Sequence, residues 1–245
     1  MIKKSVLIIG ALSDIGKSLA HKFALNGYDL QLAARNTEIL ENHCKDLKIR
    51  YKTNVSFYEF DILKTNAHKD FIKKLNNLPD IIICVVGFMG QQKENEINAD
   101  LRTNVIRTNF EGPINIISEF ANLFEQRNTG IIVGVSSVAG ERGRASNYFY
   151  GSSKAGFTAF LSGLRNRLVN KNVHVLTVLP GTVYTKMTLG LKLPKLFTSY
   201  PDKVADDIYQ AVIKKKNVIY TIKIWRLIMM FIKIIPEGIF KKLKL

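Results

Sequence analysis

The feature that most constrains the fold is a series of short, continuous apolar runs separated by longer segments with helical spacing. These runs occupy residues 5–10, 28–35, 55–61, 80–87, 130–137 and 173–181. Runs of Val, Ile and Leu without polar alternation are typical of strands buried on both faces, as in a parallel sheet covered by helices. The repeated strand–helix rhythm predicts an α/β fold: a doubly wound, Rossmann-like parallel sheet flanked by helices, in a single domain.

Charge and cysteine content narrow the classes of partner. The two cysteines, Cys44 and Cys84, are far apart, and the four histidines show no metal-ligand spacing, so we expect a reducing, cytoplasmic setting and no metal site. The net charge of +16 implies an anionic partner, which could be nucleic acid, a membrane surface or a phosphorylated substrate. Because no zinc-finger, helix-turn-helix or aromatic RNA-binding motif stands out, we expect no nucleic acid.

A glycine-containing turn follows the first run. In "IIGALSDIG", Gly10 ends the expected strand and Gly16 opens the expected helix, so backbone N–H groups at the helix start can face a pyrophosphate. Arg35 follows the second run, where an acidic residue would hold the 2′-hydroxyl of NAD and an arginine suits a 2′-phosphate, so we favour NADP(H) over NAD(H). The alternatives are an ordinary strand-to-helix turn and a solvated loop arginine.

Three polar residues have the spacing of a carbonyl-reduction site. Ser137 ends a strand, and Tyr150 and Lys154 lie one turn apart if residues 148–168 form a helix. A nearby ammonium would lower the pKa of the phenol and make proton transfer to a carbonyl oxygen practical, while a serine hydroxyl holds the same oxygen. The alternative is a helix surface pair. Tyr148 competes as the tyrosine but lies about 240° around the helix from Lys154.

These motifs together resemble the short-chain dehydrogenase/reductase family over about residues 3 to 215. The matching stretches are "GALSDIG", "EFDI", "RTNFEG", Ser137 with "YGSSK", and "PGTVYTKM". The resemblance implies a catalytic set of Asn109, Ser137, Tyr150 and Lys154, with Asn109 holding a water in a proton relay from Lys154. It also implies cofactor contacts, some from residues already named: Gly10, Leu12, Ser13, Asp14, Ile15, Gly16, Arg35, Asn36, Asp61, Ile62, Gly87, Tyr150, Lys154, Pro180, Gly181, Val183 and Thr185.

Two departures from the family pattern affect the cofactor region. Asp14 stands where the family usually has its middle glycine, and we expect this carboxylate to point away from the phosphates and cap the first helix. "CVVG" at 84–87 replaces the usual Asn-Asn-Ala-Gly, so asparagine hydrogen bonds that stabilise the central sheet are absent. Neither departure touches the chemical step.

The chain divides into a predicted catalytic domain, 1–216, and a basic, apolar tail, 217–245. Within the tail, 220–235 has uncharged runs too short to span a bilayer, which needs about 20 apolar residues. On a helix, Lys223, Arg226 and Lys233 fall within an arc of about 80°. This predicts an interfacial helix on an anionic membrane, with Trp225 at the headgroup boundary. The alternative is a tail that covers the protein's own core or a partner subunit, since the family commonly forms homo-oligomers.

Basic residues near the expected pocket predict a phosphate-bearing substrate, with Arg142, Arg144 and Lys186 as candidate contacts; the alternative is solvated surface charge. The catalytic stretch and the tail also resemble reductases of polyprenyl-phosphate-linked keto-sugars, of which the decaprenylphosphoryl-2-keto-pentose reductases are typical. That resemblance implies a partner flavin oxidase and a role in cell-envelope polysaccharide synthesis. It also implies a location at the inner face of the cell membrane.

The amino-acid sequence is therefore compatible with three functions. The first is an NAD(P)H-dependent reductase of a lipid-linked or phosphorylated keto-sugar. The second is a soluble ketoreductase or alcohol dehydrogenase for a small ketone or acyl substrate. The third is a non-catalytic cofactor sensor or scaffold, against which the complete Asn109, Ser137, Tyr150 and Lys154 set argues.

Overall fold

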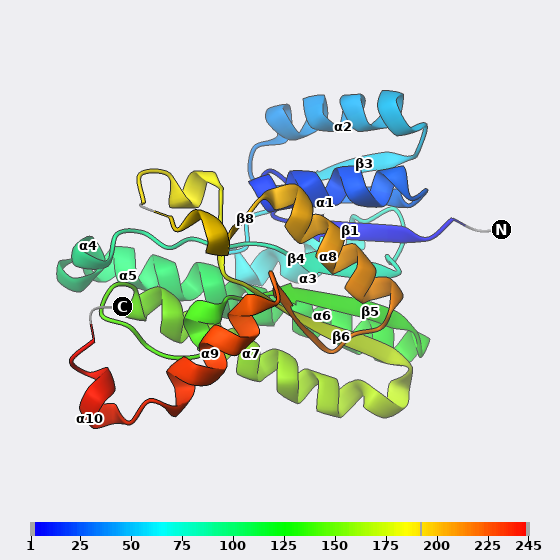
Figure 1. Cartoon of the computed structure of the whole chain (residues 1–245). Coiled ribbons are helices and arrows are strands. Elements are labelled where there is room, and N and C mark those ends of the chain that lie inside the picture. Colours follow the sequence, from blue (N-terminus) through cyan, green and yellow to red (C-terminus); the bar gives the residue numbers. More distant parts are fainter. Residues whose placement is uncertain (1–2, 192, 244–245) are drawn as a thin grey trace.

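A seven-stranded parallel sheet forms the centre of the molecule (Figure 1). The computed structural model describes residues 3–191 and 193–243. The strand order is β3-β2-β1-β4-β5-β6-β9, with the order reversing between β1 and β4. The strands are β1 (Ser5–Ile9), β2 (Asp29–Ala34), β3 (Val55–Glu59), β4 (Ile81–Cys84), β5 (Gly130–Val135), β6 (Val173–Pro180) and β9 (Val218–Thr221). The predicted doubly wound α/β fold is confirmed.

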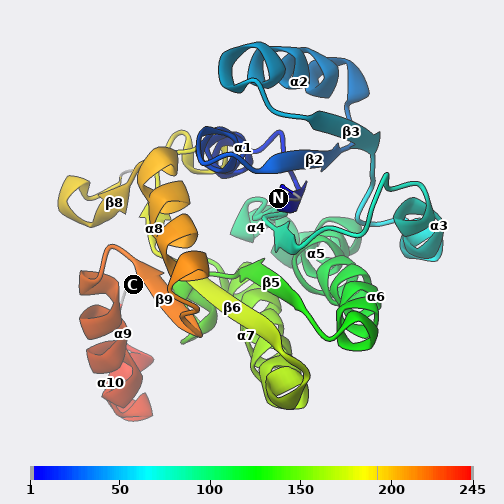
Figure 2. The same ribbon diagram turned by 90° about the vertical axis from the view of Figure 1, so that its right-hand side faces the viewer.

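Helices cover both faces of this sheet (Figure 2). They are α1 (Asp14–Leu25), α2 (Thr37–Tyr51), α3 (His68–Lys73), α4 (Gln92–Ile97), α5 (Ala99–Ile106), α6 (Gly112–Arg127), α7 (Tyr148–Leu168) and α8 (Pro201–Ile213). One apolar core lies under α1, α2 and α8, and a second lies under α3, α6 and α7. The continuous Val/Ile/Leu runs are therefore explained by burial on both faces: Leu7 and Ile8 are each fully buried, in different cores.

The seventh strand lies within the segment that the sequence assigned to the tail. β9 pairs with β6 from Thr177–Val218 to Pro180–Thr221, so the predicted boundary at 216 falls immediately before a strand of the sheet. The strand is only four residues long and follows Lys214, Lys215 and Lys216, which conceal it from a prediction based on apolar runs. The structural tail therefore begins after Thr221.

Four further elements lie outside the central sheet and the helices that cover it. A small parallel pair, β7 (Thr182–Val183) with β8 (Thr198–Ser199), brackets residues 184–197, which we call the β7–β8 segment. After β9 come α9 (Ile224–Ile234) and the short α10 (Glu237–Phe240). The inner side of α9 packs through Trp225 and Met229 on a third apolar cluster with Val138 and Leu179. No helix among the described residues is long and apolar enough to cross a membrane.

Candidate active site

A cavity of about 410 Å³ opens at the carboxyl ends of the strands, beside the point where the strand order reverses. Its walls come from the start of α1, the ends of β4, β5 and β6, the first turns of α7, the β7–β8 segment and α9. The predicted residues that line it are Leu12, Ser13, Asp14, Ile15, Gly87, Ser137, Arg144, Tyr150, Lys154, Pro180, Gly181, Val183, Thr185 and Lys186. Residues far apart in the sequence thus meet at one edge of the sheet.

The glycine turn forms the α1 side of the cavity. Gly10 has φ of +90°, and a Cβ there would lie 3.2 Å from the backbone of Val85 and Val86. A Cβ on Gly16 would lie 2.3 Å from the carbonyl oxygen of Gly10, so both positions need glycine. The first-turn N–H groups of α1 have no intrahelical acceptor, which makes this turn a cradle suited to a pyrophosphate.

The helix cap at this turn differs from the prediction. Ser13, not Asp14, is the N-cap of α1, and its hydroxyl oxygen accepts a hydrogen bond from Gly16 N at 3.0 Å. The carboxylate of Asp14 instead accepts a 2.7 Å hydrogen bond from the backbone N–H of Lys186 in the β7–β8 segment. Serine is already a good cap, so the aspartate one residue later is free to reach across the cavity.

Two close backbone contacts bring Ser137 beside α7. After β5 the chain makes a 3-10 turn at Val138–Gly140, which packs directly against the helix. A Cβ on Gly140 would lie 2.6 Å from Ala155 N, and one on Gly151 would lie 2.8 Å from the carbonyl oxygen of Ala139. Because both residues are glycines, the turn approaches α7 closely, and Ser137 lies near enough to Tyr150 to lower the pKa of the phenol.

The phenol of Tyr150 holds its proton more tightly than predicted. Burial raises its pKa to about 12, and the hydrogen bond with Ser137 only partly opposes this. The Lys154 ammonium lies 5.8 Å from the centroid of the Tyr150 ring, without a direct hydrogen bond to the phenol. The predicted lowering of the phenol pKa by Lys154 is therefore absent here: burial raises the pKa, and Ser137, not Lys154, is the group that opposes the rise.

Lys154 is buried between two strand ends. Its Nζ donates to the carbonyl oxygens of Val135 at 3.1 Å and Val86 at 3.3 Å. Burial lowers its pKa to about 8, so near neutral pH it is still mostly an ammonium. A buried ammonium held by carbonyl oxygens leaves a positive field at the base of the cavity, next to Tyr150.

Asn109 fixes the loop that follows β4. It lies in a π-helical stretch, Arg107–Glu111, between α5 and α6, and such bulges are frequent at functional sites. Its amide nitrogen donates to the carbonyl oxygens of Phe88 and Val105, and its amide oxygen accepts from Phe88 N at 3.2 Å. These bonds stabilise the loop in place of the asparagines missing from "CVVG". A Cβ on Gly87 would meet the Asn109 oxygen at 3.4 Å and Lys154 Nζ at 3.8 Å.

The two arginines that precede Tyr150, Arg142 and Arg144, differ in what they contact. Arg142 does not line the cavity: its guanidinium donates to the carbonyl oxygens of Ile232, Lys233 and Ile235, and it pairs with Glu237 at 2.8 Å. It therefore caps the end of α9, which corrects its assignment to substrate binding. Arg144 lines the cavity, burial lowers its pKa, and it has no ion-pair partner among the described residues. Its Nε is buried without a hydrogen-bond partner in that same part of the chain.

The remaining predicted cofactor residues lie outside this cavity. Arg35 is exposed just after β2, where Asn36 caps α2 through a 3.1 Å hydrogen bond from Ile39 N. Asp61 accepts a 3.1 Å hydrogen bond from Leu63 N, and Ile62 is buried in the second core. They follow β2 and β3 at the same carboxyl edge of the sheet, beyond the glycine turn, which is where the far end of a dinucleotide would reach.

Sequence reasoning missed several residues of the wall: Met89, Asn147, Met187, Leu191, Leu193 and Trp225. Trp225 is the most instructive, because it was predicted at a headgroup boundary and is instead 9% exposed. Its indole N–H donates to the carbonyl oxygen of Phe197 at 2.9 Å, and a Cβ on Gly181 would lie 1.9 Å from that nitrogen. Gly181 therefore makes room for Trp225, a pairing that no local pattern reveals.

The comparison with protein families shows to which family the chain belongs. The family model described as short chain dehydrogenase matches residues 4–194. The chain belongs to the short chain dehydrogenase family. As a member of it, the protein is an oxidoreductase, and the predicted family resemblance is confirmed.

Proteins similar to this short chain dehydrogenase match it over nearly its full length. An uncharacterised oxidoreductase of Mycobacterium tuberculosis is 30% identical over 97% of this chain and 96% of its own. A short-chain dehydrogenase from Sphingobium yanoikuyae, in complex with NADPH, superposes with a TM-score of 0.83 at 23% identity, covering 96% of this chain and 97% of its own. A 3-oxoacyl-[acyl-carrier protein] reductase from Brucella melitensis, in complex with NAD, gives 0.83 at 19% identity, covering 93% and 98%. These matches do not single out polyprenyl-phosphate keto-sugar reductases.

Proposed function

We propose that this short chain dehydrogenase reduces a carbonyl group, with Tyr150 as the proton donor. The observation that carries the proposal is the meeting of Tyr150, Ser137 and Lys154 in one cavity at the carboxyl edge of the sheet. A phenol that keeps its proton well above neutral pH suits protonation of a developing alkoxide, which is the reductive direction. The Ser137 hydroxyl, which lines the same cavity, would hold the carbonyl oxygen. The buried Lys154 ammonium favours negative charge on that oxygen.

The residues present fit a nicotinamide dinucleotide. The glycine turn leaves room for a backbone approach that a Cβ at Gly10 or Gly16 would block. The ends of β2 and β3 offer Arg35 and Asp61 for the adenosine part, and residues 180–183 with Thr185 line the cavity for the nicotinamide part. When bound, the reduced nicotinamide supplies the hydride. The exposed Arg35 favours NADPH. Of the similar structures, one is in complex with NADPH and one with NAD, so they support a nicotinamide dinucleotide without deciding between the two.

Arg144 indicates the chemistry of the substrate. An arginine that lines the cavity, desolvated and without an ion-pair partner in the described chain, is a ready site for a phosphate or carboxylate. The apolar wall of Met89, Leu191, Leu193 and Trp225 suits an apolar portion of the same molecule. The substrate class that fits both is a lipid-linked or phosphorylated keto-sugar. A flavin oxidase that forms the ketone would then be the partner enzyme, and cell-envelope polysaccharide synthesis the setting.

The second candidate is a ketoreductase for a small ketone or an acyl substrate without a phosphate. The apolar walls alone would suit it, and the similar Brucella melitensis protein, a 3-oxoacyl-[acyl-carrier protein] reductase, is a reductase of an acyl substrate. The two candidates differ in whether Arg144 has an anion to bind. A non-catalytic role is disfavoured by the family membership and by the complete catalytic set.

A matched pair of probe ketones separates these candidates. NADPH oxidation is measured with dihydroxyacetone and with dihydroxyacetone phosphate, for wild type, Arg144→Gln and the control Arg50→Gln, which alters an exposed pair on α2. Loss of a charge-assisted hydrogen bond of about 1.5–3 kcal/mol predicts a fall in kcat/KM of roughly ten- to hundredfold, for the phosphate only. Equal use of both ketones, unaffected by Arg144→Gln, favours the second candidate. No turnover of any ketone would contradict both.

A further inference from the structure

Helix α9 has two apolar faces, only one of which is covered. The inner face carries Trp225 and Met229, which are 9% and 1% exposed on the third core cluster. On the outer face, Leu227, Phe231 and Ile234 are 50%, 60% and 70% exposed. The two alternatives considered for the tail are thus compatible, because its inner face covers the protein's own core and its outer face stays open.

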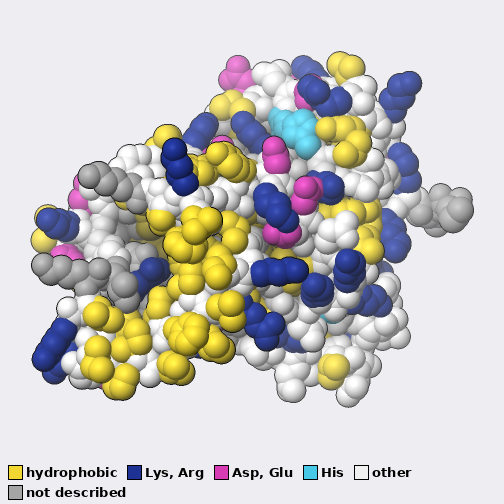
Figure 3. Space-filling view, in the orientation of Figure 1, with side chains coloured by type: hydrophobic (Ala, Val, Ile, Leu, Met, Phe, Trp, Pro, Cys, Tyr) yellow, Lys and Arg dark blue, Asp and Glu magenta, His cyan; other side chains and the backbone are white. Residues whose placement is uncertain are grey.

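The outer face continues into neighbouring elements (Figure 3). We define the tail surface as the exposed apolar side chains of α9, of α10 with the residues after it, and of the β7–β8 segment. Its members are Ile224, Leu227, Met230, Phe231, Ile234, Ile239 and Leu243 from the tail, with Met187, Leu189, Leu191 and Leu196 from the segment. Met187 and Leu191 also line the catalytic cavity, so the tail surface extends to the mouth of the site.

This surface is rigidly attached to the catalytic residues. Glu141, four residues after Ser137, accepts hydrogen bonds from Tyr220 and Lys233, each at 2.9 Å. Arg142 caps the end of α9, and its guanidinium lies 3.9 Å from the centroid of the Phe240 ring in α10. α9 is therefore held in one orientation, with its outer face directed away from the domain.

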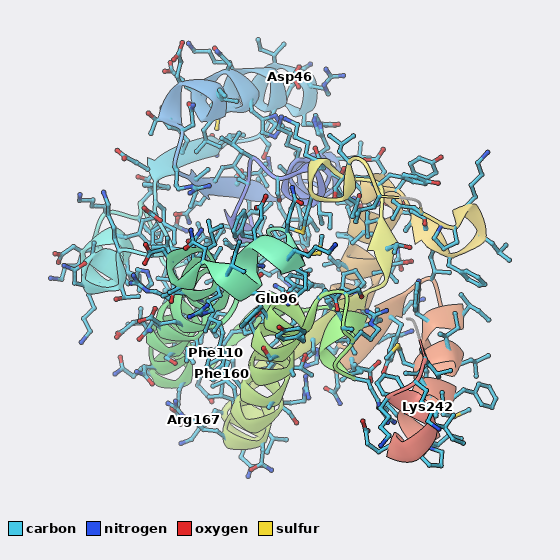
Figure 4. All side chains as sticks on the ribbon, turned by 90° about the vertical axis from the view of Figure 1, so that its left-hand side faces the viewer. Asp46, Glu96, Phe110, Phe160, Arg167 and Lys242 are labelled. Atoms are coloured by element: carbon cyan, nitrogen blue, oxygen red, sulfur yellow. The ribbon has the colours of Figure 1, made fainter. Side chains whose placement is uncertain are left out.

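The charges around the tail surface are almost all positive. Lys223, Arg226, Lys241 and Lys242 are exposed, and Figure 4 shows Lys242 on the tail, at the opposite end of the molecule from Asp46 on α2. The nearby acids Glu141 and Glu237 already pair with Lys233 and Arg142. An apolar face bordered by lysines matches the interface of an anionic bilayer. A second copy fits less well, because a two-fold contact through this face would bring its lysines together.

We propose that the tail surface docks on an anionic lipid bilayer, with α9 lying in the plane of the interface and the cavity mouth facing the lipid. The substrate then passes from the membrane to Tyr150 along Leu191 and Met187, and does not enter the surrounding water on the way. This deepens the proposed function, since it rests on the cavity being the catalytic one. The docking itself is measured without turnover, so the two can fail separately.

The test is flotation of the full-length protein with vesicles of neutral phosphatidylcholine, alone or mixed with anionic phosphatidylglycerol. Removing the tail would be a poor test, because β9 belongs to the sheet and Trp225 lines the cavity. The variant is therefore Leu227→Gln/Phe231→Gln. Its matched control is Leu25→Gln/Ile49→Gln, which alters two residues that are 65% and 81% exposed on α1 and α2. Thermal unfolding and reduction of a water-soluble ketone check that each variant is intact.

We expect wild type and the control to float with anionic vesicles, and the α9 variant to partition at least about tenfold more weakly because it loses two inserted apolar side chains. Lys241→Gln/Lys242→Gln should weaken partitioning roughly fivefold for each lysine removed, and only on anionic vesicles. The proposal is overturned if wild type does not float, if the α9 variant floats as well as wild type, or if neutral and anionic vesicles bind equally. It is also overturned if the α9 substitutions dissociate an oligomer that has no affinity for vesicles.

Discussion

The carboxylate of Asp14, in the first turn of α1, accepts a 2.7 Å hydrogen bond from the backbone N–H of Lys186, 172 residues away on the opposite wall of the cavity. This contact connects the glycine turn, where a pyrophosphate would lie, to the β7–β8 segment. It also gives a purpose to a carboxylate where the family usually has glycine. The negative charge of this carboxylate also repels a pyrophosphate. Asp14 therefore holds the two walls of the cavity together but weakens the binding of the cofactor.

Two substitutions separate the effects at Asp14. Asp14→Asn keeps an oxygen that accepts from Lys186 N but removes the charge, so NADPH affinity should rise by roughly three- to tenfold. Asp14→Ala removes both, so residues 184–197 should become more sensitive to limited proteolysis. NADPH dissociation constants are followed by the fluorescence of Trp225, which is the only tryptophan. If both variants bind NADPH as wild type does and resist protease equally, the connecting role is wrong.

Arg35 should set the preference between the two nicotinamide cofactors. It is exposed beyond β2, free to pair with a 2′-phosphate, so Arg35→Ala should weaken NADPH roughly ten- to hundredfold and leave NADH within about twofold. The measurement is the pair of dissociation constants for wild type and variant. Tighter binding of NADH than of NADPH by wild type would remove the 2′-phosphate role.

Burial of Lys154 should make stability depend on pH in a defined window. Its pKa is about 8 in the folded protein and 10.5 in the unfolded chain, so between these values the unfolded chain binds more protons. The free energy of unfolding should therefore gain about 3 kcal/mol from this group as pH rises from about 8 to 10.5. Lys154→Met should lack that gain, and the control Lys45→Met, at an exposed site, should retain it. Urea unfolding across this range is the measurement, and parallel curves for wild type and Lys154→Met would contradict it.

Gly181 and Trp225 should be energetically coupled. A Cβ on Gly181 would lie 1.9 Å from the indole nitrogen, so Gly181→Ala should displace the indole and cost roughly 1–3 kcal/mol of stability. In a Trp225→Ala background the same substitution should cost much less. The four proteins form a double-mutant cycle of unfolding free energies. Equal costs of Gly181→Ala in both backgrounds would show that the close approach does not matter.

Much of this molecule follows from local sequence patterns, and the remainder depends on contacts between distant residues. Most of the six predicted strands were recognisable as short apolar runs, although β3, at the edge of the sheet, is only partly buried. Ser137, Tyr150 and Lys154 were predictable because strand ends and helical spacing fix where such residues lie. β9 was missed because four residues after a lysine run carry no pattern. The burial of Trp225 was missed because it depends on Gly181, and that of Arg142 because it depends on the end of α9.

The pKa of Tyr150 marks a further limit of the sequence. Helical spacing placed Lys154 near the phenol. The distance of 5.8 Å from Lys154 Nζ to the centroid of the Tyr150 ring, and the burial of both groups, emerge only in the folded chain. The sign of the shift was therefore predicted wrongly, although the residues were placed correctly. The raised pKa still allows the proposed role, since a proton donor must carry its proton.

The central claim is that Tyr150 donates the proton in carbonyl reduction, and Tyr150→Phe tests it most directly. NADPH oxidation is measured with the probe ketone that wild type reduces best, and NADPH binding is followed by Trp225 fluorescence. Loss of the phenolic hydroxyl should lower turnover by roughly 10²–10⁴-fold and leave the NADPH dissociation constant within about threefold. Turnover by Tyr150→Phe at the wild-type rate would contradict the assignment.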